Sequence, residues 1–180
     1  MAKNNIKSKK GFTIIEVVLV LAIAGLIFLM VFIALPALQS SQRDTQRRED
    51  LARFSSQLNQ YSANNRGKIP ADQSEWNTFL LEYLAKVTCG SEGIHQCLID
   101  TAKSGENRFV DPDGDPYEVT YVGSAKDVDP SDARSNSFNH MIYVYDYAQC
   151  DGENVIESSG ARKVAISFRL ESAGIFCGTN

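Results

Sequence analysis

The feature that most constrains this chain is an apolar stretch close to its N-terminus. Residues 12–38 are almost wholly apolar, and no charged residue occurs from Val17 to Gln42. A helix needs roughly 20 apolar residues to cross about 30 Å of hydrocarbon. Lysines precede the stretch, and positively charged flanks favour the cytoplasmic side of a membrane. We therefore expect a helix that crosses the cytoplasmic membrane once, with the C-terminal part of the chain outside.

A single carboxylate, Glu16, stands at the start of this apolar stretch, four residues after Phe12. Ionisable groups inside a membrane segment are costly and usually have a partner. Two interpretations are open at this point. The side chain could lie among the lipid headgroups and stay hydrated, or it could pair with a positive charge.

The residues around Glu16 resemble the processing site of the precursors of type IV pilins and type II secretion pseudopilins. The match combines a basic leader ending at Lys10, the junction Gly11–Phe12, Thr13, a Glu at the fifth position of the mature chain, and an uninterrupted apolar helix. The resemblance implies that a prepilin peptidase cuts between Gly11 and Phe12, and that Phe12 is then N-methylated.

Ordinary secretion is the alternative to this processing. The small residues Ala22 and Ala24 could form the cleavage site of a signal peptide whose apolar core begins at Phe12. Such a core should end near the cut, whereas Leu26 to Leu35 is as apolar as the residues before it. We therefore expect the apolar segment to be kept in the mature protein.

Cleavage before Phe12 gives Glu16 a role in assembly. The new amine of Phe12 is positively charged, and Glu16 of a neighbouring subunit can compensate it. An unpaired charge in an apolar filament core would cost several kcal/mol, so this pairing favours the correct register. The resemblance implies as partners copies of this chain and other pilins in a helical filament, the prepilin peptidase, a membrane assembly platform with its ATPase, and the cytoplasmic membrane.

The sequence divides into four segments: a basic leader (1–11), a membrane and filament-core helix (12–38), the amphipathic half of that helix (39–67), and a globular head (68–180). Pro36 lacks a helical N–H and could kink the helix. Leu51, Phe54, Leu58 and Tyr61 then recur at helical spacing. We expect one helix from residue 12 to about residue 65, with Gly67 as its stop. The charged residues at 43–50 are expected to form a solvated face, or alternatively subunit contacts.

The remainder predicts an α+β fold of the pilin type, in which the long helix packs on an antiparallel sheet of three to four strands. Asp72 and Glu75 are typical of a helix start, and apolar residues from Trp76 onward continue that short helix. Four segments have the composition or alternation of strands: 117–122, 140–147, 163–170 and 174–177.

Four cysteines, Cys89, Cys97, Cys150 and Cys177, all lie in the C-terminal half. An even count suits two disulfides in an oxidising compartment, and three pairings are possible. A zinc site at Cys89, His95 and Cys97 fits no familiar ligand spacing. Pilins commonly carry a C-terminal region bounded by a disulfide, and this resemblance favours Cys150 with Cys177. A bridge from Cys89 to Cys97 would close a small surface loop.

Acidic residues recur in two segments. Asp111, Asp113 and Asp115 alternate as in calcium loops, but Gly114 stands at the fourth position and no Glu closes a twelve-residue loop. The segment also resembles a turn of major pseudopilins that leads into their first strand. A structural turn is the favoured interpretation and calcium the alternative. A second acidic segment, with Asp127, Asp129 and Asp132, has the same ambiguity.

Composition narrows the function further. The net charge is −4 although four lysines lie in the first ten residues, so the folded part is acidic and no specific nucleic-acid partner is evident. With two histidines, no nucleophile elbow and no phosphate-binding loop, we expect no enzyme and no cofactor apart from the calcium alternative. The expected function is a pilus subunit for adhesion, twitching motility or DNA uptake. The alternatives are a secretion pseudopilin and a monomeric, membrane-anchored binding domain.

Overall fold

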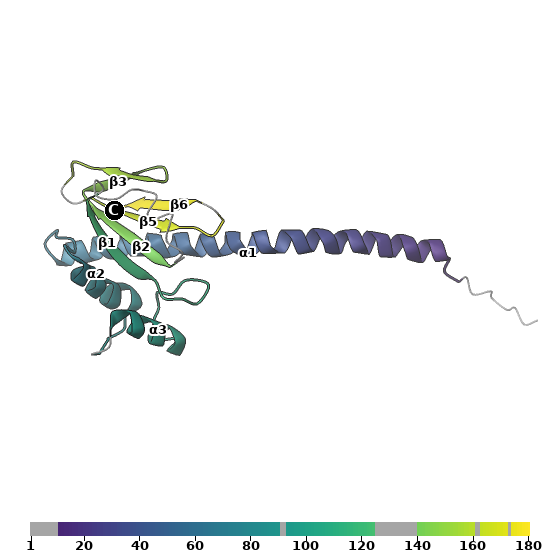
Figure 1. Ribbon diagram of the computed structural model, residues 1–180, viewed down its shortest axis with the longest axis horizontal. Helices are drawn as coiled ribbons and strands as arrows, with labels where there is room; N and C mark the ends of the chain where they lie inside the picture. The colour runs from purple at the N-terminus through teal and green to yellow at the C-terminus, as the bar shows by residue number, and fades with distance from the viewer. Residues whose placement is uncertain (1–10, 91–92, 125–139, 161–162, 173) are drawn as a thin grey trace, which may run out of the picture. The chain divides into compact units, whose positions relative to one another are not determined.

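A computed structural model describes residues 11–90, 93–124, 140–160, 163–172 and 174–180. The first element is a long helix, α1, which runs from Ile14 to Asn64 (Figure 1). The chain divides into two compact units, Met1–Gln39 and Ser40–Asn180, which we call the anchor unit and the head unit. Both contain part of α1.

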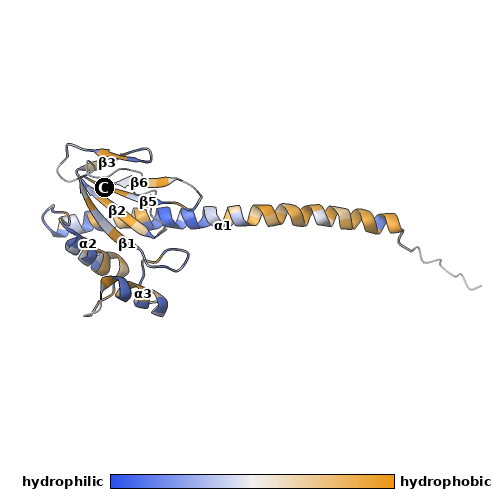
Figure 2. Ribbon diagram, viewed as in Figure 1, coloured by the Kyte–Doolittle hydropathy of each residue, from blue (hydrophilic) through white to orange (hydrophobic). Residues whose placement is uncertain are grey.

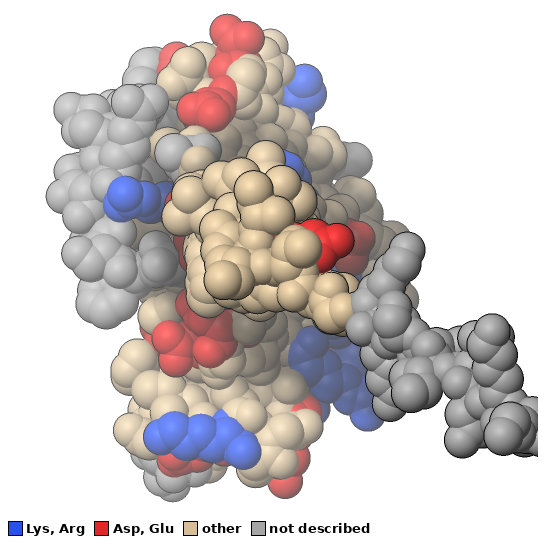
Figure 3. Space-filling view, turned by 90° about the vertical axis from the view of Figure 1, so that its right-hand side faces the viewer, with Lys and Arg blue, Asp and Glu red and all other residues tan. Residues whose placement is uncertain are grey.

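The part of α1 in the anchor unit is apolar on every side. Its large hydrophobic side chains are all exposed, from 44% for Val31 to 90% for Phe12, which precedes the helix. Figure 2 shows this part in the colours of hydrophobic residues, and Figure 3 shows its largely uncharged surface. An 18-residue window reaches a mean hydropathy of 3.2, so this helix is long and apolar enough to cross a membrane. Pro36 lies inside the helix and does not end it.

In the head unit α1 has one buried face. Asp44, Arg47, Leu51, Phe54 and Leu58 are buried at spacings of three and four residues, which place them on one side of a helix. The helix ends at Asn64, close to the expected position. There the amide of Gly67 donates to the carbonyl of Ser62 at 2.7 Å. Gly67 has φ = 81°, a conformation that glycine adopts without strain.

Three short helical elements follow: α2 (Gln73–Phe79), a turn of π-helix η1 (Leu80–Ala85), and α3 (Ile94–Ser104). Asp72 caps α2 as expected, because its carboxylate accepts from the Glu75 amide at 2.9 Å. Helix α3 was not expected, and it corrects the placement of Cys97 in a surface loop. Cys97 lies on α3 and is only 3% exposed, beside the buried Leu98.

The main sheet has four strands in the order β1-β2-β5-β6. They are β1 (Glu118–Ser124), β2 (Met141–Asp146), β5 (Val164–Arg169) and β6 (Ile175–Thr179). Three of the expected segments pair antiparallel, but β1 lies parallel to β2, so the sheet is mixed rather than wholly antiparallel. A parallel pair needs a crossover connection of about a dozen residues or more, and residues 125–140 are long enough for one.

Two further strands, β3 (Ala148–Asp151) and β4 (Asn154–Glu157), form a separate hairpin that the sequence analysis missed. The chain leaves β2 at Tyr147, whose φ of 50° is unusual for a residue with a side chain. Both strands have only four residues, which is too short for a clear alternation of buried and exposed positions.

The core of the head unit lies between α1, α2 with η1, and one face of the main sheet (Figure 1). Phe54 on α1 packs edge-on to Phe79 and stacks on Trp76, with ring centroids 5.3 and 6.1 Å apart. From the sheet, the fully or nearly fully buried side chains are Val119, Ile142, Val144, Val164, Ile166 and Phe168. Burial of these apolar faces is what fixes the second half of α1 on the sheet.

Candidate functional site

The expected processing junction lies just before α1. Gly11 and Phe12 are exposed and precede the first helical residue, Ile14. A side-chain carbon built at Gly11 would meet no atom within 4 Å. The part of the chain that the structure describes therefore leaves the backbone at this junction accessible.

Glu16 is held by a capping box at the start of α1. Its carboxylate accepts from the backbone amide and the hydroxyl of Thr13, both at 2.8 Å, and its own amide lies 3.4 Å from the Thr13 hydroxyl oxygen. Such a pair satisfies backbone donors that a helix start otherwise leaves open, and it places negative charge at the positive end of the helix dipole. The sequence analysis missed this role, although the spacing Thr-x-x-Glu is its signal.

The geometry shows one task of Glu16, and the sequence analysis predicts a second. Within one subunit it caps α1 through Thr13. The pairing of its carboxylate with the amine of Phe12 on a neighbouring subunit stays a prediction. A glutamine at position 16 could still accept the hydrogen bonds of a capping box but would carry no charge, so the two tasks can be tested apart.

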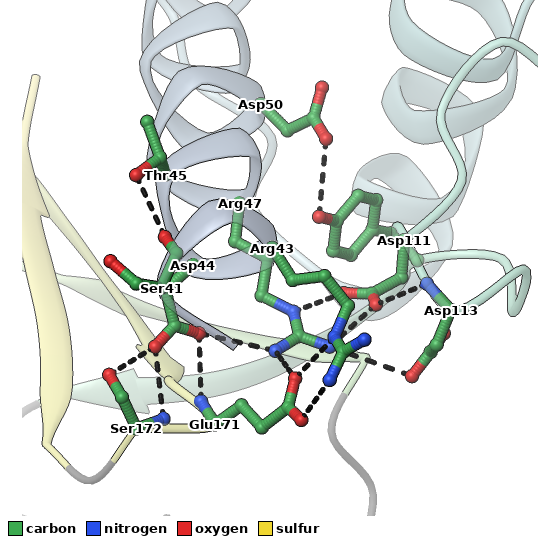
Figure 4. A network of polar contacts seen from close by, with 11 residues as sticks. Ser41, Arg43, Asp44, Thr45, Arg47, Asp50, Asp111, Asp113, Glu171 and Ser172 are labelled. Atoms are coloured by element: carbon green, nitrogen blue, oxygen red, sulfur yellow. Dashed lines mark hydrogen bonds and ion pairs between the residues drawn. The ribbon is translucent and has the colours of Figure 1, made fainter. Parts of the chain in front are cut away.

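A buried ion pair joins α1 to the segment that precedes β1, as Figure 4 shows. The guanidinium of Arg47 donates to both oxygens of Asp111, from Nε and from Nη2, each at 2.7 Å. The two side chains are 1% and 0% exposed. Hydrogen bonds to Asp111 raise the pKa of Arg47 against the effect of burial. The expectation of a solvated face at residues 43–50 is therefore wrong for Arg47.

Asp44 extends the pair to the turn between β5 and β6. Its carboxylate accepts from the backbone amides of Glu171 and Ser172, each at 2.9 Å, and from the Ser172 hydroxyl. Burial opposes the charged form of Asp44, but these hydrogen bonds outweigh it and lower the pKa of the carboxyl. Asp44 is 1% exposed, so it too is an internal residue rather than part of a solvated face.

At the rim of this cluster Arg43 pairs with Glu171, from Nε to Oε2 at 2.7 Å. These two side chains are about one-third exposed, and pairs of that kind contribute little stability. Arg47 also reaches Glu171 at 3.3 Å. The cluster of Arg43, Asp44, Arg47, Asp111 and Glu171, which we call the polar cluster, thus ties α1 to two turns of the head unit.

The segment Asp111–Tyr117 is a turn that leads directly into β1. The amide of Asp111 donates to the carbonyl of Asp115 at 2.8 Å, and the amide of Gly114 donates to the carbonyl of Asp111 at 2.9 Å. Gly114 has φ = 102°, which a residue with a side chain would adopt only under strain. This geometry matches the turn that the sequence analysis favoured.

Calcium binding at this turn stays a prediction, and two observations weigh against it. Both oxygens of Asp111 already accept from Arg47, and Asp113 lies 3.5 Å from the same guanidinium. A metal ion would compete with that charge. Among the described residues, no group of three or more metal-binding side chains is arranged to hold an ion. The second acidic segment, with Asp127, Asp129 and Asp132, lies outside the described residues.

The four cysteines form two disulfides, Cys89–Cys97 and Cys150–Cys177, in agreement with the expected pairs. The first links the segment after η1 to the buried face of α3. The second links β3 to β6 and so ties the hairpin to the edge of the main sheet. His95, the third member of the zinc alternative, contacts Glu118 instead.

Comparison with known proteins bears on the start of the chain. The family model for the prokaryotic N-terminal methylation motif matches residues 6–32. No curated protein and no solved structure matches the chain. The matched segment contains Gly11, Phe12, Glu16 and the first half of the apolar helix, and the α+β head is consistent with a pilin-like fold. This motif is the signature of the precursors of type IV pilins and pseudopilins.

Proposed function

We propose that this chain is a structural subunit of a type IV pilus filament, which polymerises through its N-terminal helix after removal of residues 1–11. The observation that carries the proposal is the exposed apolar surface of α1, most of which lies within the residues that match the methylation motif. Such a surface is unfavourable in water and requires cover by lipid or by other apolar helices. A filament core supplies that cover after the subunit leaves the membrane.

The order of events follows from the positions of the charges. The helix first holds the subunit in the cytoplasmic membrane, with the head unit outside. Cleavage before Phe12 then creates an amine at the start of an apolar helix. In the filament, Glu16 of one subunit compensates the amine of another, so that only the correct docking register leaves no charge unpaired. The finished filament would display the head units to the exterior for adhesion, twitching motility or DNA uptake.

A second candidate is a pseudopilin of a type II secretion system. The turn Asp111–Tyr117 favours it, because the turn leads directly into β1, as in the major pseudopilins that the sequence resembles. The two disulfides favour the pilin. Cells that lack this chain distinguish the two candidates: loss of surface filaments supports a pilin, and loss of exported protein with filaments intact supports a pseudopilin. A monomeric anchored domain predicts neither loss.

The processing step gives the first test. Gly11→Leu should leave a precursor with its leader attached, because the peptidase must approach the backbone closely at this junction. Gly25→Ala is the control, since Gly25 lies within the exposed apolar part of α1, away from the junction, and its change should leave cleavage intact. Mass spectrometry of the mature N-terminus reads out both. A mature chain that begins at Gly25, instead of at methylated Phe12, would overturn the proposal.

A further inference from the structure

The β3–β4 hairpin carries two exposed apolar side chains. Tyr147, directly before β3, is 55% exposed, and Ile156 of β4 is 38% exposed. Every other exposed large hydrophobic among the described residues lies between Phe12 and Leu38, in the anchor unit. Single exposed apolar residues are usually scattered over a protein surface. In the described part of the head unit they occur together, on one short hairpin.

The strand pairing shows which way the hairpin faces. Cys150 and Val155 lie opposite each other and contact the smaller apolar cluster of the head unit. Gln149 and Ile156 form the next opposite pair. Because neighbouring residues of a strand point to opposite faces, Ile156 points away from that cluster, to the outer face of the hairpin.

Tyr147 is exposed in a backbone conformation that disfavours it. Its φ is 50°, which is uncommon for a bulky residue. The other described non-glycine residues with positive φ, Arg66 and Lys86, follow helix ends, where this conformation is common. Tyr147 instead joins β2 to the hairpin, and its carbonyl accepts from the Ser158 amide at 2.6 Å. A glycine would make this turn at lower cost, and the tyrosine ring gains little burial in return. We therefore expect the ring to make its contact outside this chain.

The charge of the hairpin indicates the kind of partner. Residues 147–158 contain no Lys or Arg and three carboxylates, all exposed: Asp151, Glu153 and Glu157. Lys163 lies beside them and donates to Gln149 at 3.1 Å, so the sum stays negative. A cationic partner is favoured, since complementary charge guides association. A guanidinium also stacks on aromatic rings, which a compact ammonium group does less well.

We propose that the outer face of the hairpin, with Tyr147 and Ile156, is a docking surface for an arginine-rich protein segment. A guanidinium stacks on the Tyr147 ring, its apolar stem contacts Ile156, and the carboxylates attract the charge. The Cys150–Cys177 disulfide and a hydrogen bond from the Cys150 amide to the Thr179 hydroxyl, at 2.9 Å, tie the hairpin to β6 (Figure 1). The surface is thus held on the main sheet, and the inference does not depend on which filament the chain builds.

The test uses the full chain in neutral detergent micelles with both disulfides intact. The probe is a blocked peptide of three Arg-Gly repeats, compared with the same peptide carrying lysine or uncharged citrulline. NMR shifts of the backbone amides of residues 147–158 give the affinities. We expect the arginine peptide to bind more tightly than the lysine peptide, the citrulline peptide not to bind, and added salt to weaken binding.

Variants of Tyr147 separate binding from folding. Tyr147→Gly should weaken the arginine peptide by about threefold, as one exposed cation–π contact implies. It should not lower the Tm, because glycine relieves the positive φ. Tyr147→Phe keeps the ring and should bind as wild type. Glu153→Gln should weaken binding, and Glu106→Gln is its matched control, because Glu106 is an exposed glutamate outside the hairpin.

The proposal is overturned if the citrulline peptide binds as tightly as the arginine peptide, or if Tyr147→Gly binds as wild type. A lower Tm for Tyr147→Gly would also overturn it, since the ring would then serve the fold. Equal losses from Glu153→Gln and Glu106→Gln would show that only net charge acts. Two other occupants are tested alongside. Growth of wild-type particles with concentration, abolished by Tyr147→Gly, would assign the surface to a second copy, and shifts caused by maltose at residues 147–158 would assign it to a sugar.

Discussion

The two halves of α1 show how one helix can serve two environments. From Ile14 to Gln39 its apolar side chains are exposed on every side. From Ser40 to Asn64 the buried positions form one stripe, and the first two of them are the charged residues Asp44 and Arg47. The apolar side chains of the first half are exposed, whereas the second half packs against other elements of the head unit. Figure 2 shows the corresponding change in hydropathy along the helix.

Because the two halves of α1 differ in their contacts, we expect mutations in each half to have different effects. A change in the first half should alter what the helix does with lipid or with other subunits, and should leave the head folded. A change in the buried stripe of the second half should alter the stability of the head, and should leave cleavage at Gly11 intact. Mutations that mix these outcomes would show that the halves are not independent.

The largest effect is expected at Glu16. Glu16→Ala should be inserted and cleaved, but filament number should fall by more than about tenfold, because an unpaired amine in the core costs several kcal/mol. Glu16→Gln should fall equally, since it keeps an acceptor for the capping box and loses the charge. Glu16→Asp should be intermediate, because the charge stays and its reach shortens. Filaments are counted by electron microscopy.

Two controls separate assembly from folding in this experiment. Thr13→Ala removes the capping partner of Glu16 and keeps its charge, so it should reduce filament number far less. Thermal unfolding of the full chain in detergent should be the same for wild type and all four variants. Normal filament numbers from Glu16→Gln would mean that Glu16 acts only as a helix cap.

The second-largest effect is expected at Arg47, in the other half of α1, and concerns the stability of the head. Arg47→Met should destabilise the head by about 3–5 kcal/mol, because it leaves the buried Asp111 and Asp44 carboxylates without their cation. Arg47→Lys should lose less, since one charge remains but cannot bind Asp111 through two nitrogens. Denaturant unfolding gives the free energies, and the mature N-terminus should still begin at Phe12.

Arg48→Ala is the matched control for Arg47, because the next residue along the helix is exposed. Its effect on the free energy of unfolding should stay within about 0.5 kcal/mol. If Arg47→Met were as stable as Arg48→Ala, the polar cluster would not fix α1 to the head, and the apolar stripe alone would have to do so.

The disulfides should have the smallest effects. Replacing Cys150 and Cys177 by Ala opens a link across 27 residues and should cost about 3.5 kcal/mol in the chain-entropy account. The link from Cys89 to Cys97 spans 8 residues and gives about 2.5 kcal/mol. Because Cys97 is buried on α3, its loss should also loosen that helix and not only a loop. The free energies of unfolding of the two double variants show which disulfide stabilises the head more. A larger loss of stability on removing Cys89–Cys97 than on removing Cys150–Cys177 would contradict this expectation.

Several elements could be predicted because their causes are local in the sequence. The spacing of Leu51, Phe54 and Leu58 defines a helix face, Asp72 with Glu75 defines a helix start, and Gly67 and Gly114 stand where the backbone has positive φ. The Thr13–Glu16 capping box has an equally local signal, which was overlooked. The sequence analysis assigned Thr13 and Glu16 only to the processing motif. One carboxylate can belong to that motif and also cap the helix.

Other features depend on contacts between segments far apart in the chain, and a local sequence pattern does not predict such contacts. A charged run on a helix is usually solvated, and only the approach of the turns at Asp111 and Glu171 makes Asp44 and Arg47 internal. The parallel pairing of β1 with β2 depends on the path of the chain between them. Helix α3 was missed because the segment that contains Cys89 and Cys97 was interpreted as a loop.

The sequence by itself determined the methylation motif, a helix long and apolar enough to cross a membrane, and the continuation of that helix into an amphipathic half, because motif, apolar length and periodicity are properties of neighbouring residues. The tertiary structure decided the strand order, the burial of Arg47 against Asp111 and the hydrogen bonds of Asp44 to the turn between β5 and β6. Each of these joins residues far apart in the chain. Burial and hydrogen bonding at such contacts are settled only when the whole head folds, since water is excluded from them only then.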